Sequence, residues 1–130
     1  MEVHKLISLA FEAREKAYAP YSKFKVGASI EMEDGSVYTG CNIENAAYGA
    51  TNCAERTAIF KAVYEGCRQI KTICVVGPIG QYTYPCGICR QVIAEFADNN
   101  TKIIIAKNEN EYIVKSFEEI LPGAFTKKDL

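Results

Sequence analysis

The sequence has little of several features that mark whole classes of protein. It has one histidine, His4, among 130 residues, and no apolar run of about 18 residues that could span a membrane. Charged residues interrupt the first 16 positions, where a secretory signal would need a continuous apolar segment. We therefore expect a cytoplasmic protein that does not enter a membrane.

An excess of positive charge is also missing. Fifteen Lys and Arg are balanced by sixteen Asp and Glu spread along the chain, which leaves no basic patch for a polyanion. We therefore expect no nucleic-acid partner. Internal repeats, linkers and low-complexity segments are absent too, and a chain of this length with 48% hydrophobic residues can bury one core. The expectation is a single domain over residues 1–130.

Cysteine, in contrast, is frequent. Six cysteines in a protein expected in a reducing compartment favour metal binding over disulfides. Cys86 and Cys89 form a CxxC motif after Pro85, a residue typical of a helix entry. Cys53 begins a second predicted helix, and a helix start favours thiolate over thiol. Three such thiolates would leave tetrahedral zinc one open position for water, the arrangement of catalytic sites.

Two other interpretations of the thiols stay open. The CxxC could be a redox pair, or Cys41 could join the other three in a closed, structural four-thiolate zinc site. Cys67 and Cys74 are interpreted as core or surface thiols without an assigned role.

Glu55 stands two residues after Cys53. With Asn52 it has the spacing of a capping box, so it could serve only to hold the start of its own helix. It can face the same metal as Cys53 only if the site lies over the end of the helix.

Hydrophobic periodicity predicts the elements of the fold. An amphipathic helix is expected over 2–18, and Asp34-Gly35 marks the turn of a hairpin within 25–43. A helix that is apolar all round, and hence buried, is expected from about 52 to 66. The remaining elements are strands over 72–77, 102–107 and 111–116, a helix over 86–97, and a short tail over 117–125. This order implies an α/β protein with a mixed sheet and helices on both faces.

Five segments of the chain, in order, resemble one known family. They are FKVGA (24–28), CNIENAAYG (41–49), NCAERTA (52–58), PCGICRQV (85–92) and LPGAF (121–125). The pair CAER and PCGIC resembles the zinc-dependent nucleobase deaminases, and the whole set is similar to the small bacterial type of cytidine deaminase. The resemblance implies a three-layer α/β/α fold with a mixed five-stranded sheet, assembled as a homotetramer.

The resemblance also implies a mechanism. Cys53, Cys86 and Cys89 would hold one zinc ion per chain, which activates a water for attack on the ring carbon that bears the amine. Glu55 would carry the protons. Cytidine and deoxycytidine would be hydrolysed to uridine and deoxyuridine with release of ammonia, a reaction of pyrimidine salvage.

Three thiolates leave the zinc centre with a net negative charge. Arg56 is placed to donate hydrogen bonds to the ligand sulfurs, although a surface ion pair is the alternative. Arg90 receives no assigned role.

Substrate-binding residues are expected in three further segments. Asn42 and Glu44 stand two apart near a strand end, so both side chains point the same way and suit a sugar hydroxyl. Glu44 would repel a phosphate, and the chain lacks a glycine-rich phosphate loop, so the substrate is expected to be a nucleoside. Phe24 would border the pyrimidine, and the backbone near Ala46 would read the base edge.

Phe125 lies on a tail after Pro122 and Gly123. It could fold back onto its own core, but the resemblance implies that it reaches into the active site of a neighbouring subunit. The stretch GQYTYP (80–85) departs from the family pattern and is not diagnostic of function.

Two other functions remain in competition: deamination of a cytosine-bearing antibiotic, and a zinc-stabilised binding module in which Glu55 only caps its helix.

Overall fold

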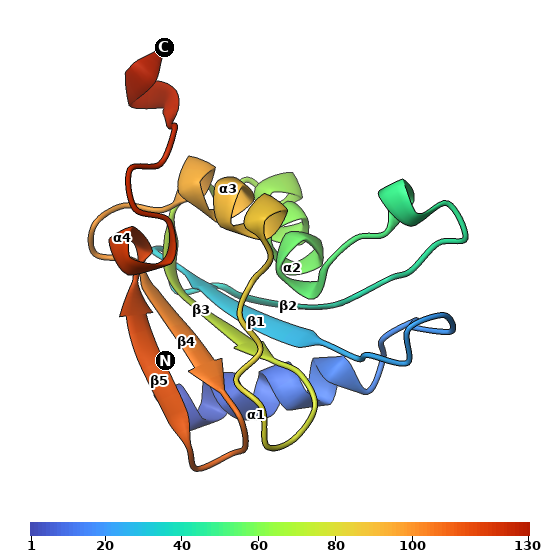
Figure 1. Ribbon diagram of the computed structural model, residues 1–130. Coiled ribbons are helices and arrows are strands. Elements are labelled where there is room, and N and C mark those ends of the chain that lie inside the picture. Colours follow the sequence, from blue (N-terminus) through green and yellow to red (C-terminus); the bar gives the residue numbers. More distant parts are fainter.

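A computed structural model describes residues 1–130, which form a five-stranded sheet with helices on both faces (Figure 1). The elements in chain order are α1 (Val3–Arg14), β1 (Gly27–Met32), β2 (Val37–Cys41), the 3-10 helix η1 (Tyr48–Ala50), α2 (Ala54–Tyr64), β3 (Ile70–Val76), α3 (Gly87–Phe96), β4 (Lys102–Ala106), β5 (Tyr112–Ser116), α4 (Phe117–Ile120) and the 3-10 helix η2 (Lys127–Asp129).

The sheet has the strand order β2-β1-β3-β4-β5. β1 is antiparallel to both of its neighbours, β3 and β4 are parallel, and β5 is antiparallel to β4. Because β2 and β3 are both antiparallel to β1, they run in the same direction. The segments that lead from them into α2 and α3 therefore leave from the same edge of the sheet.

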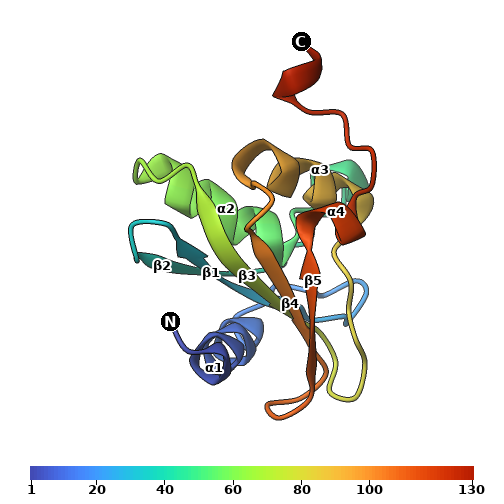
Figure 2. The same ribbon diagram turned by 90° about the vertical axis from the view of Figure 1, so that its left-hand side faces the viewer.

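Two apolar clusters define the layers. α1 covers one face with Leu6, Ile7 and Ala10, whereas α2 and α3 cover the other face over a larger cluster that includes Ala58 and Ile93. Figure 2 shows α1 separated from α2 and α3 by the sheet. The expected three-layer α/β/α fold with a mixed sheet is confirmed.

Two glycines allow the helices to approach the strands closely. A Cβ atom on Gly27 would lie 2.0 Å from the Ala10 carbonyl oxygen of α1, and one on Gly40 would lie 2.5 Å from the Ala54 carbonyl oxygen of α2. Since backbone atoms in helices cannot give way, only glycine fits at these positions. Gly40 thereby fixes the height of the first turn of α2 above the sheet.

The hairpin and the strands follow the predicted order. The β1–β2 turn occurs at Asp34-Gly35, and Gly35 has a φ of 89°, which glycine adopts without strain. β3 begins at Ile70, two residues before the predicted start of that strand.

The first helix is shorter than predicted. α1 ends at Arg14, not at residue 18, because the following segment pairs with the chain after β2. The Tyr18 backbone donates to the Asn42 carbonyl oxygen at 3.0 Å and accepts from the Glu44 amide at 2.8 Å. A tertiary pairing of this kind outweighs the helical periodicity, which is a local signal.

The expectation that the helix over 52–66 is buried all round is wrong for its outer face. Phe60 of α2 is 48% exposed and Tyr64 is 87% exposed. These two aromatic side chains do not pack into the core of this chain. None of the helices is both long and apolar enough to cross a membrane.

Two segments project from the body in Figure 1, and the second of them also projects in Figure 2. One is the arm, defined here as residues 42–52 between β2 and α2, which carries η1. The other is the tail, residues 121–130, which ends in η2.

Candidate active site

Three thiols meet where α2 and α3 begin. Cys53 is the residue that precedes α2, Cys86 precedes α3, and Cys89 lies in the first turn of α3. All three sulfurs lie within 4.8 Å of one another, and the Cys53 and Cys86 sulfurs are 3.6 Å apart. The common direction of β2 and β3 is what brings these two helix starts together.

This geometry fits a zinc ion. A tetrahedral zinc with Zn–S distances of about 2.3 Å holds its sulfurs about 3.8 Å apart, close to the observed 3.6 Å between Cys53 and Cys86. Both helices direct the positive ends of their dipoles toward the thiols, which favours thiolate ligands. The donor set fits one zinc ion per chain with a fourth position left open.

A closed four-thiolate site is not what the structure forms. Cys41 is absent from the thiol group, although the alternative interpretation placed it there. Its carbonyl oxygen instead accepts a hydrogen bond from Thr57 at the side of α2. Cys67 and Cys74 also lie outside the group, and all six cysteines are free of disulfides.

Glu55 lies beside the thiols and does not cap its helix. Asn52, its expected partner in a capping box, instead donates its amide to the Thr57 hydroxyl at 3.0 Å. The Glu55 side chain is almost completely buried. Burial raises the pKa of Glu55 to about 7, and the negative charge of Cys53 adds to the rise. A carboxyl group with this pKa can both accept and donate a proton near neutral pH.

The pKa values of Cys53 and Cys89 are shifted in opposite directions. A hydrogen bond from the Cys89 thiol, helped by donors on Arg56 and Cys86, lowers the pKa of Cys53 to about 5. The same interaction, together with burial, raises the pKa of Cys89. In the zinc-free chain, Cys53 therefore becomes a thiolate at a lower pH than Cys89 does.

Arg56 supports this charge directly. Its Nη2 donates to the Cys53 sulfur at 3.4 Å and to the Thr51 carbonyl oxygen at 3.3 Å, and it forms no ion pair with a carboxylate. The alternative of a surface ion pair is thus wrong. The Arg56 Nε is buried without a hydrogen-bond partner, so this side of the thiol cluster offers further donor capacity.

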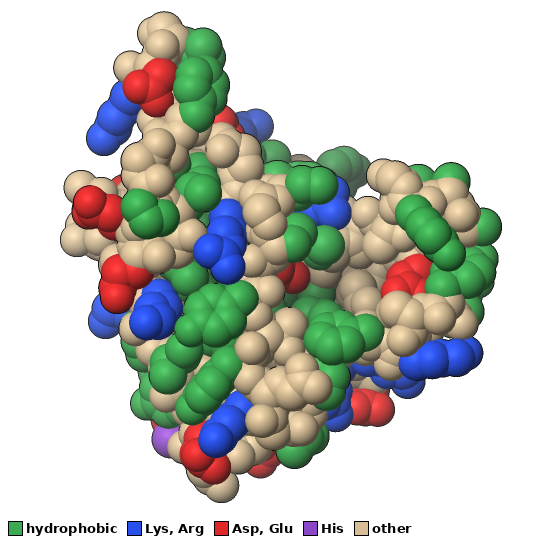
Figure 3. Space-filling view, viewed as in Figure 1, with side chains coloured by type: hydrophobic (Ala, Val, Ile, Leu, Met, Phe, Trp, Pro, Cys, Tyr) green, Lys and Arg blue, Asp and Glu red, His purple; other side chains and the backbone are tan.

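A cavity of about 350 Å³ opens over Glu55, Cys53 and Cys86. Figure 3 shows the surface hollowed on this face, where the arm meets the body. The lining residues are Ser22, Phe24, Val26, Asn42, Thr51, Cys53, Ala54, Glu55, Thr83, Tyr84 and Cys86. A larger cavity of about 440 Å³ lies between α2 and the arm, but it contains none of the thiols. Because Glu55 and two of the thiols line only the smaller cavity, we take the smaller cavity as the candidate active site.

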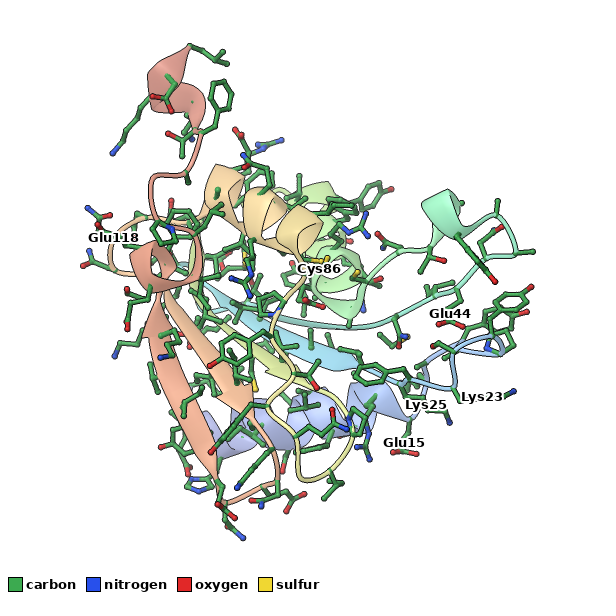
Figure 4. All side chains as sticks on the ribbon, in the orientation of Figure 1. Glu15, Lys23, Lys25, Glu44, Cys86 and Glu118 are labelled. Carbon is green, nitrogen blue, oxygen red and sulfur yellow. The ribbon has the colours of Figure 1, made fainter.

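Asn42 and Glu44 both reach the segment before β1. The Asn42 amide accepts from the Val26 backbone at 2.9 Å and donates to the Phe24 carbonyl oxygen at 2.7 Å. Glu44 accepts from the Ser22 hydroxyl and from the backbone amides of Tyr21 and Ser22. Asn42 lines the cavity, but Glu44 does not, and Figure 4 shows Glu44 apart from Cys86, toward the loop that carries Lys23.

Ala46 and Phe125 are not brought to the cavity within this chain. Ala46 is exposed on the arm. Phe125 is 61% exposed on the tail, so it does not fold back onto its own core. Its carbonyl oxygen accepts from Gln91 of α3 at 2.8 Å, which ties the tail to the outer side of that helix.

The structure adds residues that the sequence patterns did not single out. Thr83 and Tyr84 line the cavity, and both belong to the GQYTYP stretch (80–85). Their position just before Cys86 was the only signal that could have indicated them. Arg90 has a structural role, because it donates to the carbonyl oxygens of Pro85 and Ile120 at 2.7 and 2.8 Å.

Comparison with known families agrees with this geometry. The model of the cytidine and deoxycytidylate deaminase zinc-binding region matches residues 1–107. The chain belongs to this deaminase family. The three thiols and the buried carboxylate thus lie in a zinc-binding region by sequence as well as by shape.

Relatives in this family are similar over the full chain. A protein named cytidine deaminase from Sporosarcina psychrophila is 51% identical, covering 100% of this chain and 96% of the relative. Another from Halalkalibacterium halodurans is 50% identical, covering 100% of this chain and 98% of the relative. The crystal structure of cytidine deaminase from Burkholderia pseudomallei has a TM-score of 0.90 and 47% identity, covering 96% of this chain and 100% of that one.

Proposed function

We propose that this protein catalyses the hydrolytic deamination of cytidine and deoxycytidine to uridine and deoxyuridine, with release of ammonia. The observation that carries the proposal is a buried carboxyl group, Glu55, in one cavity with a zinc-binding set of thiols. Relatives about 50% identical over the full length are named cytidine deaminase, which supports this reaction over a binding module without chemistry.

Cys53, Cys86 and Cys89 would hold the zinc ion, which when bound supplies a water of lowered pKa as the nucleophile. Glu55 accepts a proton of this water and delivers it to the ring nitrogen next to the reacting carbon. Glu55 then takes the second proton from the hydroxyl group that has been added to the ring carbon and passes it to the departing amine, which leaves as ammonia.

Arg56 and the two helix starts counter the negative charge of the thiolates. Three thiolates and a divalent cation sum to one negative charge, which opposes ionisation of a bound water. The hydrogen bond from Arg56 to Cys53 withdraws part of that charge from the sulfur.

Phe24 and Asn42 form the walls for the nucleoside. Phe24 is 40% exposed at the cavity and borders the flat pyrimidine. Asn42 holds the Phe24 carbonyl oxygen, and so positions this wall besides offering its own amide to the sugar. Glu44 holds the Ser22 loop and repels a phosphate, and the backbone near Ala46 reads the edge of the base.

Assembly as a homotetramer, with Phe125 donated to the active site of a neighbour, completes the proposal. Exposed aromatic residues support it: Phe60 and Tyr64 lie on the outer face of α2, and Phe125 is free on the tail. Exposed aromatic side chains are enriched in subunit interfaces. We place the enzyme in the cytoplasm, where its six free thiols stay reduced.

Incubation of the zinc-loaded protein with cytidine, followed by the loss of cytosine absorbance and the release of ammonia, tests the reaction. Glu55→Gln is the matched control, because the amide keeps the shape of the side chain but cannot carry protons. Turnover should fall at least about a hundredfold while zinc content stays at one per chain. A folded, zinc-loaded wild type without turnover would favour the binding module instead.

A further inference from the structure

Tyr84 is a cavity residue to which the proposed reaction assigns no task. It lies two residues before Cys86, lines the same cavity as Glu55 and Phe24, and is 46% exposed. An aromatic side chain that stays this exposed beside a metal-binding set is free to meet a ligand.

The loop that carries Tyr84 is held from several sides. Arg14 of α1 donates to the Gly77 carbonyl oxygen at 2.9 Å, and the Gly80 amide donates to the Lys107 carbonyl oxygen at 2.8 Å. The Thr83 side chain packs so tightly on Gly77 that a Cβ there would lie 2.1 Å from the Thr83 hydroxyl oxygen. Tyr84 is therefore presented by a fixed backbone.

Its ring is also held. The Arg90 guanidinium carbon lies 5.9 Å from the centre of the Tyr84 ring, a cation–π distance. Arg90 is itself anchored by the carbonyl oxygens of Pro85 and Ile120. A ring preorganised in this way loses little freedom when a ligand packs against it.

Most polar side chains that line the cavity beside Tyr84 already have hydrogen-bond partners within the chain. Ser22 donates to Glu44 and accepts from the Phe24 amide, and both ends of the Asn42 amide are bonded to backbone. The Thr83 hydroxyl is buried without a partner. Tyr84, which also lines the cavity, has a hydroxyl that forms no hydrogen bond with the protein.

We propose that Tyr84 is a specificity-determining residue that contacts the bound nucleoside. Its ring packs against the substrate as a second aromatic wall beside Phe24, and its hydroxyl forms a hydrogen bond with the substrate. This inference rests on the proposed deaminase function and assigns the binding site a contact beyond the zinc ligands and Glu55.

Steady-state kinetics with cytidine on the zinc-loaded, full-length protein test it. Tyr84→Phe removes only the hydroxyl and should raise KM about threefold, whereas Tyr84→Ala also removes the ring and should raise KM about tenfold. In both, kcat should stay within about twofold and competition by uridine should weaken in parallel, because the loss is in binding.

Tyr82 supplies the matched control. It is a tyrosine of the same loop, 37% exposed and stacked on Lys107, but it does not line the cavity. Tyr82→Ala should leave the KM for cytidine unchanged. Thermal unfolding and size-exclusion chromatography of each variant report on folding and assembly.

The outcomes separate the two claims. An active wild type whose KM is the same in Tyr84→Ala would overturn the role of Tyr84 and leave the deaminase intact. The role of Tyr84 would also be overturned if Tyr84→Ala lost activity only because it no longer assembled, while its assembled fraction kept an unchanged KM. A wild type without turnover on cytidine would refute the proposed function, and this inference with it.

Discussion

Replacing Glu55 with glutamine in the zinc-free protein tests the electrostatics of the buried carboxyl group. The pKa of Glu55 is about 7 in the folded chain, against an ordinary value of 4.5. The raised pKa means that the folded state favours the neutral acid. The contribution to stability is therefore fully present below about pH 4.5 and is lost as the pH rises through about 7.

The size of the effect follows from this difference in pKa. A shift of about 2.5 units corresponds to about 3 kcal/mol at 1.36 kcal/mol per unit. Cys53 acts in the opposite direction, because its lowered pKa of about 5 contributes stability that is lost as the pH falls from about 9 to about 5. The wild-type profile alone mixes both effects, so the comparison with Glu55→Gln is needed to isolate Glu55.

Urea denaturation of both proteins, with a chelator and a reductant present, provides the measurement. The free energy of unfolding of the wild type minus that of Glu55→Gln should rise by about 2 to 3 kcal/mol between pH 7.5 and pH 4.5. A difference that stays flat in the zinc-free proteins would show that water reaches Glu55 and that the burial argument is wrong.

Three other predictions concern the zinc site and the tail. Cys41→Ala should keep one zinc per chain by metal analysis while Cys86→Ala loses it; loss of zinc in Cys41→Ala would restore the closed four-thiolate site. Arg56→Gln should weaken zinc affinity about tenfold in a chelator competition. Unchanged zinc affinity and activity would show that Arg56 does not support the Cys53 thiolate. Phe125→Ala should raise the KM for cytidine about fivefold with little change in melting temperature, whereas a fully active monomer would refute donation of Phe125 between subunits.

The zinc ligands were predictable because their signal is local. A thiol at a helix start is visible in the sequence as Pro85, Cys86 and Cys89, and the mixed sheet follows from the order of short apolar runs. What brings Cys53 to the same place is the shared direction of β2 and β3, which depends on strand pairing.

The errors and omissions have a long-range cause. The end of α1 was misplaced because Tyr18 pairs with the chain after β2, 24 positions farther along. Tyr84 was overlooked because an aromatic residue in a loop has no periodic pattern, and only its neighbours in space give it a role. The outer face of α2 was expected to be core because composition alone does not show which side of an apolar helix packs on the sheet.

The position of the thiols in the fold also separates a catalytic zinc from a structural one. A structural zinc holds together segments that have no other reason to pack. Here α2 and α3 already pack on an apolar cluster that includes Ala58, Ile59 and Ile93, all fully buried. The thiols occupy the ends of these helices, at the wall of a cavity, outside that cluster. Because the apolar cluster already packs α2 and α3 on the sheet, the thiols are not needed to hold these helices in place, and a zinc ion bound there would keep one position open for chemistry.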